Sequence, residues 1–385
     1  MRDFEFQTVP HIMMSYGAAR RMGELLRARY AGLARVCVVT DRFLNTSGLI
    51  RPALDSLAAQ GWQVTLIDDV IADPPDHVVL EAAQRARQAR VEVVVGLGGG
   101  SSMDVAKLIA VLATSDQPLG DMYGLGKVRG PRLPLVQVPT TAGTGSEVTC
   151  VSIVTTGATT KAGVVSPHLY ADMAVLDAEL TLDLPAPVTA ATGIDAMVHA
   201  IEAYTSAHKK NPLSDGLARQ ALALLSRHLL RACRDPHDRE AREAMLLGAM
   251  LAGQAFANAP VAAVHALAYP LGGHFHVPHG LSNSLVLPHV LRFNAEAARE
   301  LYAELAAIVV PDSTGTSAQR CAAFIDYCAE LSPQTGIASR LSEVGVKAGD
   351  LDMLADDGML QTRLLVNNPR EVNRADALAI YQAAL

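Results

Sequence analysis

The 385-residue chain lacks three features that would direct it to nucleic acid, to secretion or to a disulfide-stabilised fold. It has no basic excess, because 32 Lys and Arg stand against 39 Asp and Glu for a net charge of −7, so it has no surplus of positive charge for nucleic acid or anionic lipid. Its five cysteines show no CxxC or paired spacing, which indicates free thiols in a reducing compartment. Residues Met1 to Val9 lack the basic-then-apolar order of a signal peptide. We therefore expect a cytoplasmic protein with no nucleic-acid or membrane partner.

Charged side chains are also missing from Ala244 to Leu291, which contains no Asp, Glu, Lys or Arg. The stretch is long enough to span a bilayer. However, polar residues, prolines and a glycine pair interrupt it, and no Lys or Arg cluster flanks it. We interpret it as the buried central helix of a helical domain, followed by a buried active-site loop.

The order of patterns along the chain predicts two domains. Short β-branched runs at Arg35 to Thr40, Gln63 to Asp68 and Val91 to Val95 alternate with helical patterns in the first half, which is typical of a mostly parallel sheet covered by helices. From about Pro185 the strand signals stop and Ala- and Leu-rich periodic segments continue to Leu385. We therefore predict an α/β domain over residues 1–184 and an all-helical domain over residues 185–385.

A glycine-rich turn follows the third predicted strand. In VVVGLGGGSSMDVAK, Gly98, Gly99 and Gly100 lead to a helix that opens at Ser101 and Ser102. Glycines let the backbone approach a diphosphate, and free N–H groups at a helix start provide positive potential. The loop matches neither the usual dinucleotide fingerprint nor a Walker loop, and a tight turn capped by serine would give the same pattern.

Further polar residues follow other predicted strands. Thr140, Thr141 and Thr144 bring hydroxyl groups beside flexible glycines in VPTTAGTGSEVT, a loop able to wrap a pyrophosphate or ribose. Asp41 ends the strand RVCVVT and could accept hydrogen bonds from an adenosine ribose while repelling a 2′-phosphate. A surface aspartate would look the same. The functional interpretation favours NAD over NADP.

Four residues are spaced to hold one divalent metal: Asp195, His199, His265 and His279. Asp195 and His199 share one helix face, and Glu202 follows on that face as an outer acceptor. Fourteen residues of straight helix would separate His265 from His279 by about 21 Å, so the chain must turn between them, and Pro270, Gly272, Gly273 and Pro278 are the residues expected to make that turn.

Spacing leaves the last ligand open. His274 and His276 lie in the same segment and could replace His279. One carboxylate and three imidazoles suit Fe(II), Zn(II), Co(II) or Ni(II). Such an ion can bind an alcohol oxygen and lower the pKa of the hydroxyl group. For water, a bound ion lowers the pKa from 15.7 to about 7.

Four blocks carry a resemblance to a known family: GGGSSMDVAK, VPTTAGTGSEVT, GIDAMVHAIEAYTS, and His265 to Gly280. In these blocks, and over nearly its whole length, the chain resembles the iron-containing (group III) alcohol dehydrogenases, which share the dehydroquinate synthase-like architecture. The resemblance implies an N-terminal nucleotide-binding domain and a helical metal-binding domain. It also implies reversible hydride transfer between an alcohol or its aldehyde and NAD(H), with Fe(II) as the usual ion and Zn(II) as an alternative.

Two further expectations come from the residues themselves. The positions expected to line the pocket, Val151, Phe256 and Val261, are mostly apolar and favour primary aliphatic alcohols or their aldehydes. The N-terminal segment FEFQTVPHIMMSYG could give a strand to a second copy and form a homodimer.

The resemblance also assigns residues. The metal ligands would be Asp195, His199, His265 and His279. The cofactor would meet Asp41, Gly98, Gly99, Gly100, Ser101, Ser102, Asp104, Thr140, Thr141, Thr144, Lys161 and Leu180.

One departure from the family concerns the proton relay. Many relatives carry a histidine four residues after the third ligand, where this chain has Tyr269. Because tyrosine has an unperturbed pKa near 10, it relays protons poorly at neutral pH. We predict that Tyr269 orients water or substrate and that His276 or solvent carries the proton.

Two other functions stay open on the sequence. A hydroxyacid–oxoacid transhydrogenase would hold and recycle its cofactor within one site. The loss of a metal ligand would favour a non-catalytic NAD- or metal-binding sensor, and none of the four ligands is missing from the sequence.

Overall fold

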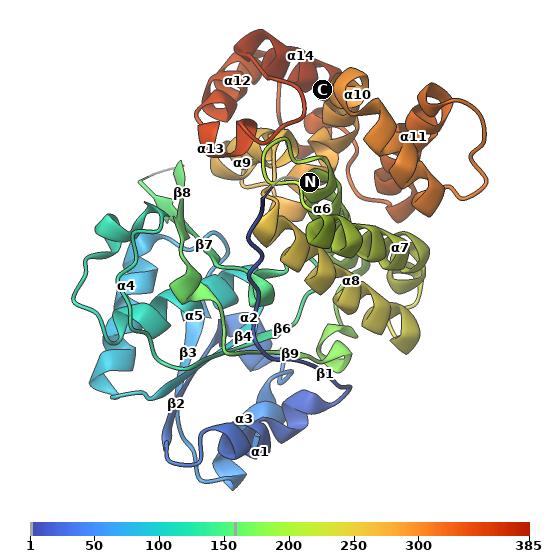
Figure 1. Cartoon of the computed structure of the whole chain (residues 1–385). Helices are drawn as coiled ribbons and strands as arrows, with labels where there is room; N and C mark the ends of the chain where they lie inside the picture. Colours follow the sequence, from blue (N-terminus) through green and yellow to red (C-terminus); the bar gives the residue numbers. More distant parts are fainter. Residues whose placement is uncertain (1–2, 158–159) are drawn as a thin grey trace. The chain divides into compact units, whose positions relative to one another are not determined.

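The computed structural model describes residues 3–157 and 160–385, which fall into two compact units. The α/β unit comprises Thr8–Thr141 and Gly145–Asp183. The helical unit comprises Leu184–Leu385, residues 3–7 and Ala142–Thr144. Figure 1 follows both along the chain.

A parallel sheet forms the centre of the α/β unit, with the strand order β1-β9-β6-β4-β2-β3. The strands are β1 (Ile12–Met14), β2 (Arg35–Asp41), β3 (Gln63–Val70), β4 (Val93–Gly98), β6 (Leu135–Pro139) and β9 (Met173–Leu176). The three predicted strands are β2, β3 and β4, with ends shifted by up to three residues. The residues of β4 and β6 are buried throughout, as expected for strands covered on both faces.

Helices and a second sheet complete this unit. The helices are α1 (Met22–Arg29), α2 (Arg42–Thr46), α3 (Arg51–Ala59), α4 (Asp76–Gln88) and α5 (Gly100–Leu112). The second sheet joins β5 (Gly124–Leu125), β8 (Thr160–Val165) and β7 (Val151–Thr156). Five short 3-10 turns lie among the described residues of the unit: η1 (Ala18–Arg21), η2 (Leu119–Met122), η3 (Ser146–Val148), η4 (Pro167–Leu169) and η5 (Ala178–Thr181).

The strand order creates a switch point between β2 and β4. From β2 the chain moves to β3 on one side, then returns to β4 on the other side and continues to β6. In open parallel sheets, ligands bind beyond the carboxyl ends of strands at such a point. Asp41 and the Gly98 to Ser102 turn lie at these ends.

The helical unit confirms the prediction that no strand follows Pro185 in the described chain. Its helices are α6 (Ala186–Thr205), α7 (Pro212–Arg234), α8 (Arg239–Asn258), α9 (Ala263–Phe275), α10 (His279–Val309), α11 (Ser317–Thr335), α12 (Leu351–Met359), α13 (Thr362–Leu365) and α14 (Arg374–Ala384). Two 3-10 turns, η6 (Leu341–Val344) and η7 (Ala348–Asp350), precede α12. Helix α6 packs against α7, α8 and α10 (Figure 1), and every residue from Gly193 to Thr205 is buried.

The uncharged stretch differs from the predicted helix and loop. It contains the end of α8, all of α9 and the start of α10. Pro270, Gly272 and Gly273 lie inside α9 and do not form the turn; His276, with φ of 54°, ends α9, and Pro278 caps α10. Burial of Leu267 and Leu271 offsets helix-propensity costs of about 3 kcal/mol for proline and about 1 kcal/mol for each glycine.

None of the helices in residues 3–157 and 160–385 is by itself long and apolar enough to cross a membrane. Together, α8 and α9 have the length and apolar composition of a membrane span, but the two helices are bent by 106° where they meet.

Candidate functional site

Three helices bring the four predicted ligands together. Asp195 and His199 lie one turn apart on α6, His265 lies near the start of α9, and His279 is the first residue of α10. Asp195 Oδ1 is 3.9 Å from His199 Nε2, 3.8 Å from His265 Nε2 and 3.5 Å from His279 Nε2. One ligand atom from each residue fits within 4.8 Å of the others.

Two polar side chains surround this group. Glu202, one turn beyond His199 on α6, accepts from His265 Nδ1 at 2.6 Å and from the Val264 N–H at 2.7 Å. This bond places the ring proton on Nδ1 and leaves the Nε2 lone pair facing Asp195. Asn283, one turn beyond His279 on α10, donates to Asp195 Oδ1 at 2.6 Å.

Burial and neighbouring charges shift the pKa values of His199 and Asp195. Burial lowers the pKa of His199 to about 3, reinforced by His265 and His279 and opposed by Asp195. Burial raises the pKa of Asp195, but the imidazoles and the Asn283 hydrogen bond outweigh it, so the net shift is downward. A neutral imidazole and an ionised carboxylate are the states that bind a metal.

The donor set fits a small divalent ion. With bonds of about 2.0–2.2 Å, a tetrahedral ion separates its ligand atoms by about 3.4 Å, close to the observed Nε2 to Oδ1 distances of 3.5–3.9 Å. Three nitrogen atoms and one oxygen atom are the ligands that iron and zinc accept.

The neighbouring histidines lie outside the group. His274 Nε2 contacts Asp357 Oδ2 on α12, and His276 is exposed at the end of α9. Of the three histidines that the spacing left open, His279 is the one in the group of four.

Aromatic and aliphatic side chains flank the ligands on one side. The Phe256 ring stacks on His199 with centroids 4.3 Å apart, and the Tyr269 ring lies 6.0 Å from the His279 ring. Both pack against a cluster of Val261, Ala266 and Leu364, together with Leu365. The metal candidate therefore has an apolar border within the helical unit.

Several of the predicted cofactor residues lie at the carboxyl ends of three adjacent strands, β2, β4 and β6. Gly99 is the N-cap residue of α5 and makes no side-chain hydrogen bond to the start of the helix. The Thr140 N–H donates to Gly98 O at 3.0 Å. A Cβ on Gly98 would lie 2.7 Å from Ser102 Cβ, so the turn requires glycine there. Asp41 Oδ1 accepts from the Leu44 N–H at 2.9 Å, as the cap of α2.

Other predicted cofactor residues have partners of their own. Lys161 Nζ on β8 pairs with Asp73 Oδ1. Leu180, in η5, is part of the buried core beneath the sheet. Thr144 groups with the helical unit, whereas Thr140 and Thr141 belong to the α/β unit.

A buried lysine organises the same edge, and the sequence analysis missed it. Lys107 Nζ on α5 donates to Ser146 Oγ at 2.7 Å, Thr149 Oγ1 at 3.0 Å and Val151 O at 2.7 Å. Asp104 Oδ1 accepts from Ser146 Oγ at 2.6 Å and Oδ2 from the Ile153 N–H at 2.9 Å. The carboxylate predicted to meet the cofactor therefore ties α5 to η3 and β7.

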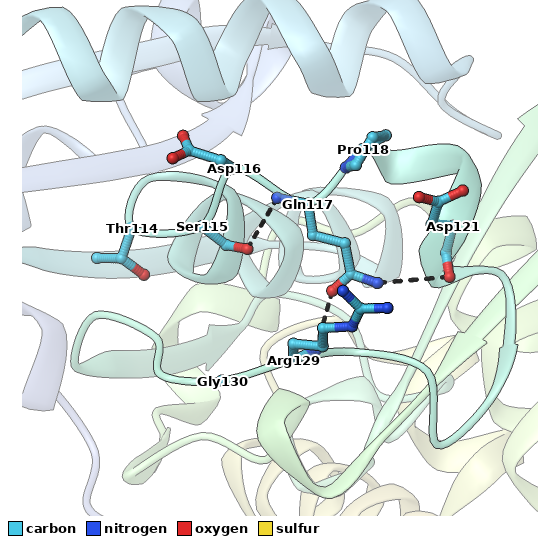
Figure 2. Close-up of a pocket in the computed structure, with 8 residues that line it drawn as sticks. All are labelled: Thr114, Ser115, Asp116, Gln117, Pro118, Asp121, Arg129 and Gly130. Carbon is cyan, nitrogen blue, oxygen red and sulfur yellow. Dashed lines mark hydrogen bonds between the residues drawn. The ribbon is translucent and has the colours of Figure 1, made fainter.

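A pocket of about 420 Å³ lies in the α/β unit, and Figure 2 shows the residues that line it. Gln117 spans it, accepting from the Arg129 N–H at 2.9 Å and donating to Asp121 O at 3.4 Å. Its lining residues include none of those predicted for metal or cofactor, and the amide serves to fasten the loop.

Two family models together match most of the chain. The model described as iron-containing alcohol dehydrogenase matches residues 10–178, and the one described as the Fe-containing alcohol dehydrogenase family, C-terminal, matches residues 189–385. The chain belongs to the iron-containing alcohol dehydrogenase family.

Individual relatives match over nearly their full length. Long-chain-alcohol dehydrogenase 1 of Geobacillus thermodenitrificans (strain NG80-2) is 40% identical over 360 residues, covering 92% of this chain and 90% of that protein. The crystal structure of 1,3-propanediol oxidoreductase superposes with a TM-score of 0.95 at 34% identity, covering 100% of both chains. Sulfoacetaldehyde reductase from Bifidobacterium kashiwanohense, in complex with NAD+, gives a TM-score of 0.89 at 30% identity and covers 100% of this chain and 99% of that one.

These matches confirm the predicted fold class, family and enzyme class. The protein is an NAD-dependent alcohol dehydrogenase, an oxidoreductase that acts on small alcohols or aldehydes in a family that uses NAD and a metal ion.

Proposed function

We propose that Asp195, His199, His265 and His279 bind one divalent metal, and that the enzyme interconverts primary aliphatic alcohols and aldehydes with NAD(H). The observation that carries the proposal is the convergence of three Nε2 atoms on one buried carboxylate oxygen at 3.5–3.9 Å. When bound, the ion supplies Lewis acidity, which lowers the pKa of a hydroxyl group.

The ion is Fe(II) in this proposal, with Zn(II) as the alternative. Family membership favours iron, and the three imidazoles and one carboxylate suit both ions. The residues themselves hold the site ready: Glu202 keeps the His265 lone pair directed at Asp195, and burial keeps His199 neutral.

NAD(H) is assigned to the carboxyl ends of β2, β4 and β6. The uncapped N-terminus of α5, a helix of 13 residues, faces this edge, and backbone N–H groups at a helix start favour a diphosphate. Asp41 at the end of β2 would accept from a ribose hydroxyl and repel a 2′-phosphate, so NADP(H) binds more weakly. Thr140, Thr141, Thr144, Lys161 and Leu180 remain in the proposed cofactor set.

An aliphatic substrate is supported by the apolar border of the metal site. Phe256 stacks on His199, and Phe256 and Leu365 pack against a cluster that contains Val261. Burying each CH₂ group contributes about 0.8 kcal/mol. Three relatives are named for long-chain alcohols, 1,3-propanediol and sulfoacetaldehyde, and the apolar border favours the first of these classes.

Proton transfer is assigned to His276 or solvent, with Tyr269 orienting water or substrate. The Tyr269 ring is 6.0 Å from the His279 ring, near enough to orient a molecule beside the ligands. An unchanged turnover of Tyr269→Phe would remove this tyrosine from the mechanism, and an unchanged His276→Ala would remove the histidine.

A homodimer and a cytoplasmic location complete the proposal. Strand β1 lies at the edge of the sheet, paired only with β9 in this chain as described, and an edge strand can pair with that of a second copy. Light scattering after size exclusion measures the mass.

The test is anaerobic turnover of linear alcohols of increasing length with NAD+ or NADP+, on protein stripped of metal and reloaded with Fe(II) or Zn(II). We expect reduction of NAD+ that requires metal and improves with chain length. Turnover that needs no added NAD+ and stops without an oxoacid acceptor would support the transhydrogenase instead. Bound metal and NAD+ without turnover of any alcohol would support the sensor.

A further inference from the structure

A buried amide lies among the four proposed ligands. Asn283 has no exposed surface, and its Nδ2 is 2.6 Å from Asp195 Oδ1, 3.2 Å from His265 Nε2 and 3.3 Å from His279 Nε2. All three are among the atoms through which these residues would bind a metal.

The ligands alone determine how this amide is oriented. Asn283 Oδ1 is buried and has no hydrogen-bond partner among the described residues, which is unfavourable for a polar atom. The reversed amide would place Oδ1 against the Asp195 carboxylate, where two acceptors repel each other. The donor contacts of Nδ2 with the ligands therefore outweigh the missing partner of Oδ1.

A metal ion and the Asn283 amide need the same lone pairs. Asn283 Nδ2 carries two hydrogens, so beside Asp195 Oδ1 it can donate to one imidazole Nε2 at a time, and a lone pair that accepts from Nδ2 cannot also bind an ion. An amide hydrogen carries partial positive charge, so its hydrogen bond stabilises the Asp195 carboxylate in part, as a cation would more strongly.

We propose that Asn283 is a positioning residue that substitutes for the cation, holding Asp195, His265 and His279 together in the metal-free protein and lowering the affinity for metal by competing with it. The competition keeps the ligands convergent before the ion arrives and allows the ion to be exchanged. This inference rests on the metal site proposed above.

The test compares wild type with Asn283→Ala. The dissociation constant for Zn(II) is measured by competition with a chromophoric chelator, and the unfolding temperature is measured with and without Zn(II). Because the variant loses competing hydrogen bonds, we expect Zn(II) to bind about 5- to 30-fold more tightly. We also expect a lower unfolding temperature without metal and a larger increase on adding Zn(II).

A matched control is Asn294→Ala. Asn294 is a buried amide on the same helix, and it exchanges hydrogen bonds of 2.9 and 2.7 Å with Asn368. Its loss should lower the unfolding temperature equally with and without Zn(II) and leave the affinity unchanged. If Asn283→Ala does not fold without metal, Asn283→Ser, which keeps one smaller donor, should give an intermediate increase in affinity.

Each outcome has a distinct meaning. Unchanged or weaker Zn(II) binding by the Asn283 variants overturns the role of Asn283, and weaker binding would mean that the amide supports Asp195 as a ligand. Failure of the wild-type protein to bind Zn(II), Fe(II) or Co(II) would instead refute the metal site itself.

Discussion

Replacing Glu202 by glutamine should weaken metal binding by reversing the tautomer of His265. In the wild type, Glu202 Oε1 accepts from the Val264 N–H at 2.7 Å, and Oε2 accepts from His265 Nδ1 at 2.6 Å. A glutamine that keeps the first bond must turn its NH₂ group toward Nδ1. The ring proton then moves to Nε2, the atom that faces Asp195 at 3.8 Å, and the lone pair needed for a metal is lost.

The size of this effect follows from the bond that is reversed. Outer hydrogen bonds to ligating histidines change metal affinity by about 10- to 100-fold, which is about 1.4–2.7 kcal/mol. Hydrogen bonds to a charged group contribute about 1.5–3 kcal/mol, which gives the same range. The expected result is a dissociation constant for Zn(II) raised by one to two orders of magnitude, measured by chelator competition.

A glutamine at Glu92 is the matched control. Glu92 Oε2 also accepts two hydrogen bonds, from the Ala34 and Arg35 N–H groups at 2.8 and 2.9 Å, but it lies in the α/β unit. Glu92→Gln should leave the Zn(II) affinity unchanged. A Glu202→Gln enzyme whose affinity stays within about threefold of wild type would refute the tautomer argument.

Three further predictions concern pH, the lysine of α5 and helix packing. Burial raises the pKa of Glu147 to about 7, so the folded state keeps a proton that the unfolded chain releases near pH 4.3. The free energy of unfolding therefore falls as pH rises from about 4.5 to about 7. Glu147→Gln should remove up to about 3 kcal/mol of this fall, measured by urea titrations at about pH 5 and pH 8. Lys107→Met should lower the free energy of unfolding by about 3–5 kcal/mol because it leaves buried acceptors unpaired. It should also weaken NAD+ binding, measured by fluorescence titration. An unchanged free energy of unfolding together with an unchanged NAD+ affinity would contradict the role of Lys107. Gly280→Ala would place a Cβ 2.4 Å from the Ala191 carbonyl oxygen. The resulting displacement of His279 should weaken Zn(II) binding at least tenfold, which corresponds to about 1.4 kcal/mol. Gly216→Ala, whose Cβ would meet nothing within 4 Å in the described part of the chain, should leave Zn(II) binding unchanged.

The metal candidate was predictable because its geometry is partly local. One turn of helix puts Asp195, His199 and Glu202 on one face whatever the rest of the fold does. The choice of His279 over His274 was not local, since it depends on Asp357 of α12, which pairs with His274. The turn between His265 and His279 was misplaced for a similar reason, because burial keeps Pro270 inside α9.

The nucleotide edge was predictable as a set of loops and not as a set of contacts. Strand–glycine–helix order identifies the carboxyl ends of β2 and β4, because parallel strands end at one edge of a sheet. What each polar group contacts depends on pairs such as Asp104 with the Ile153 N–H, 49 residues apart in sequence. The chain pattern carries no sign of such long-range partners, so Lys107 was missed and Asp104 was expected to be available to the cofactor.

Helix geometry also explains why the polar groups of the metal candidate are there at all. Asp195, His199 and Glu202 form a polar stripe on α6, and His279 and Asn283 form one on α10, inside a helical unit otherwise packed with alanine and leucine. Burying a carboxylate pair with neutral imidazoles costs several kcal/mol per charge, and apolar residues at these positions would give a more stable fold. Stability therefore cannot account for the two stripes. A cation that binds only the folded state would offset this cost by mass action, so the two stripes favour the metal site proposed above.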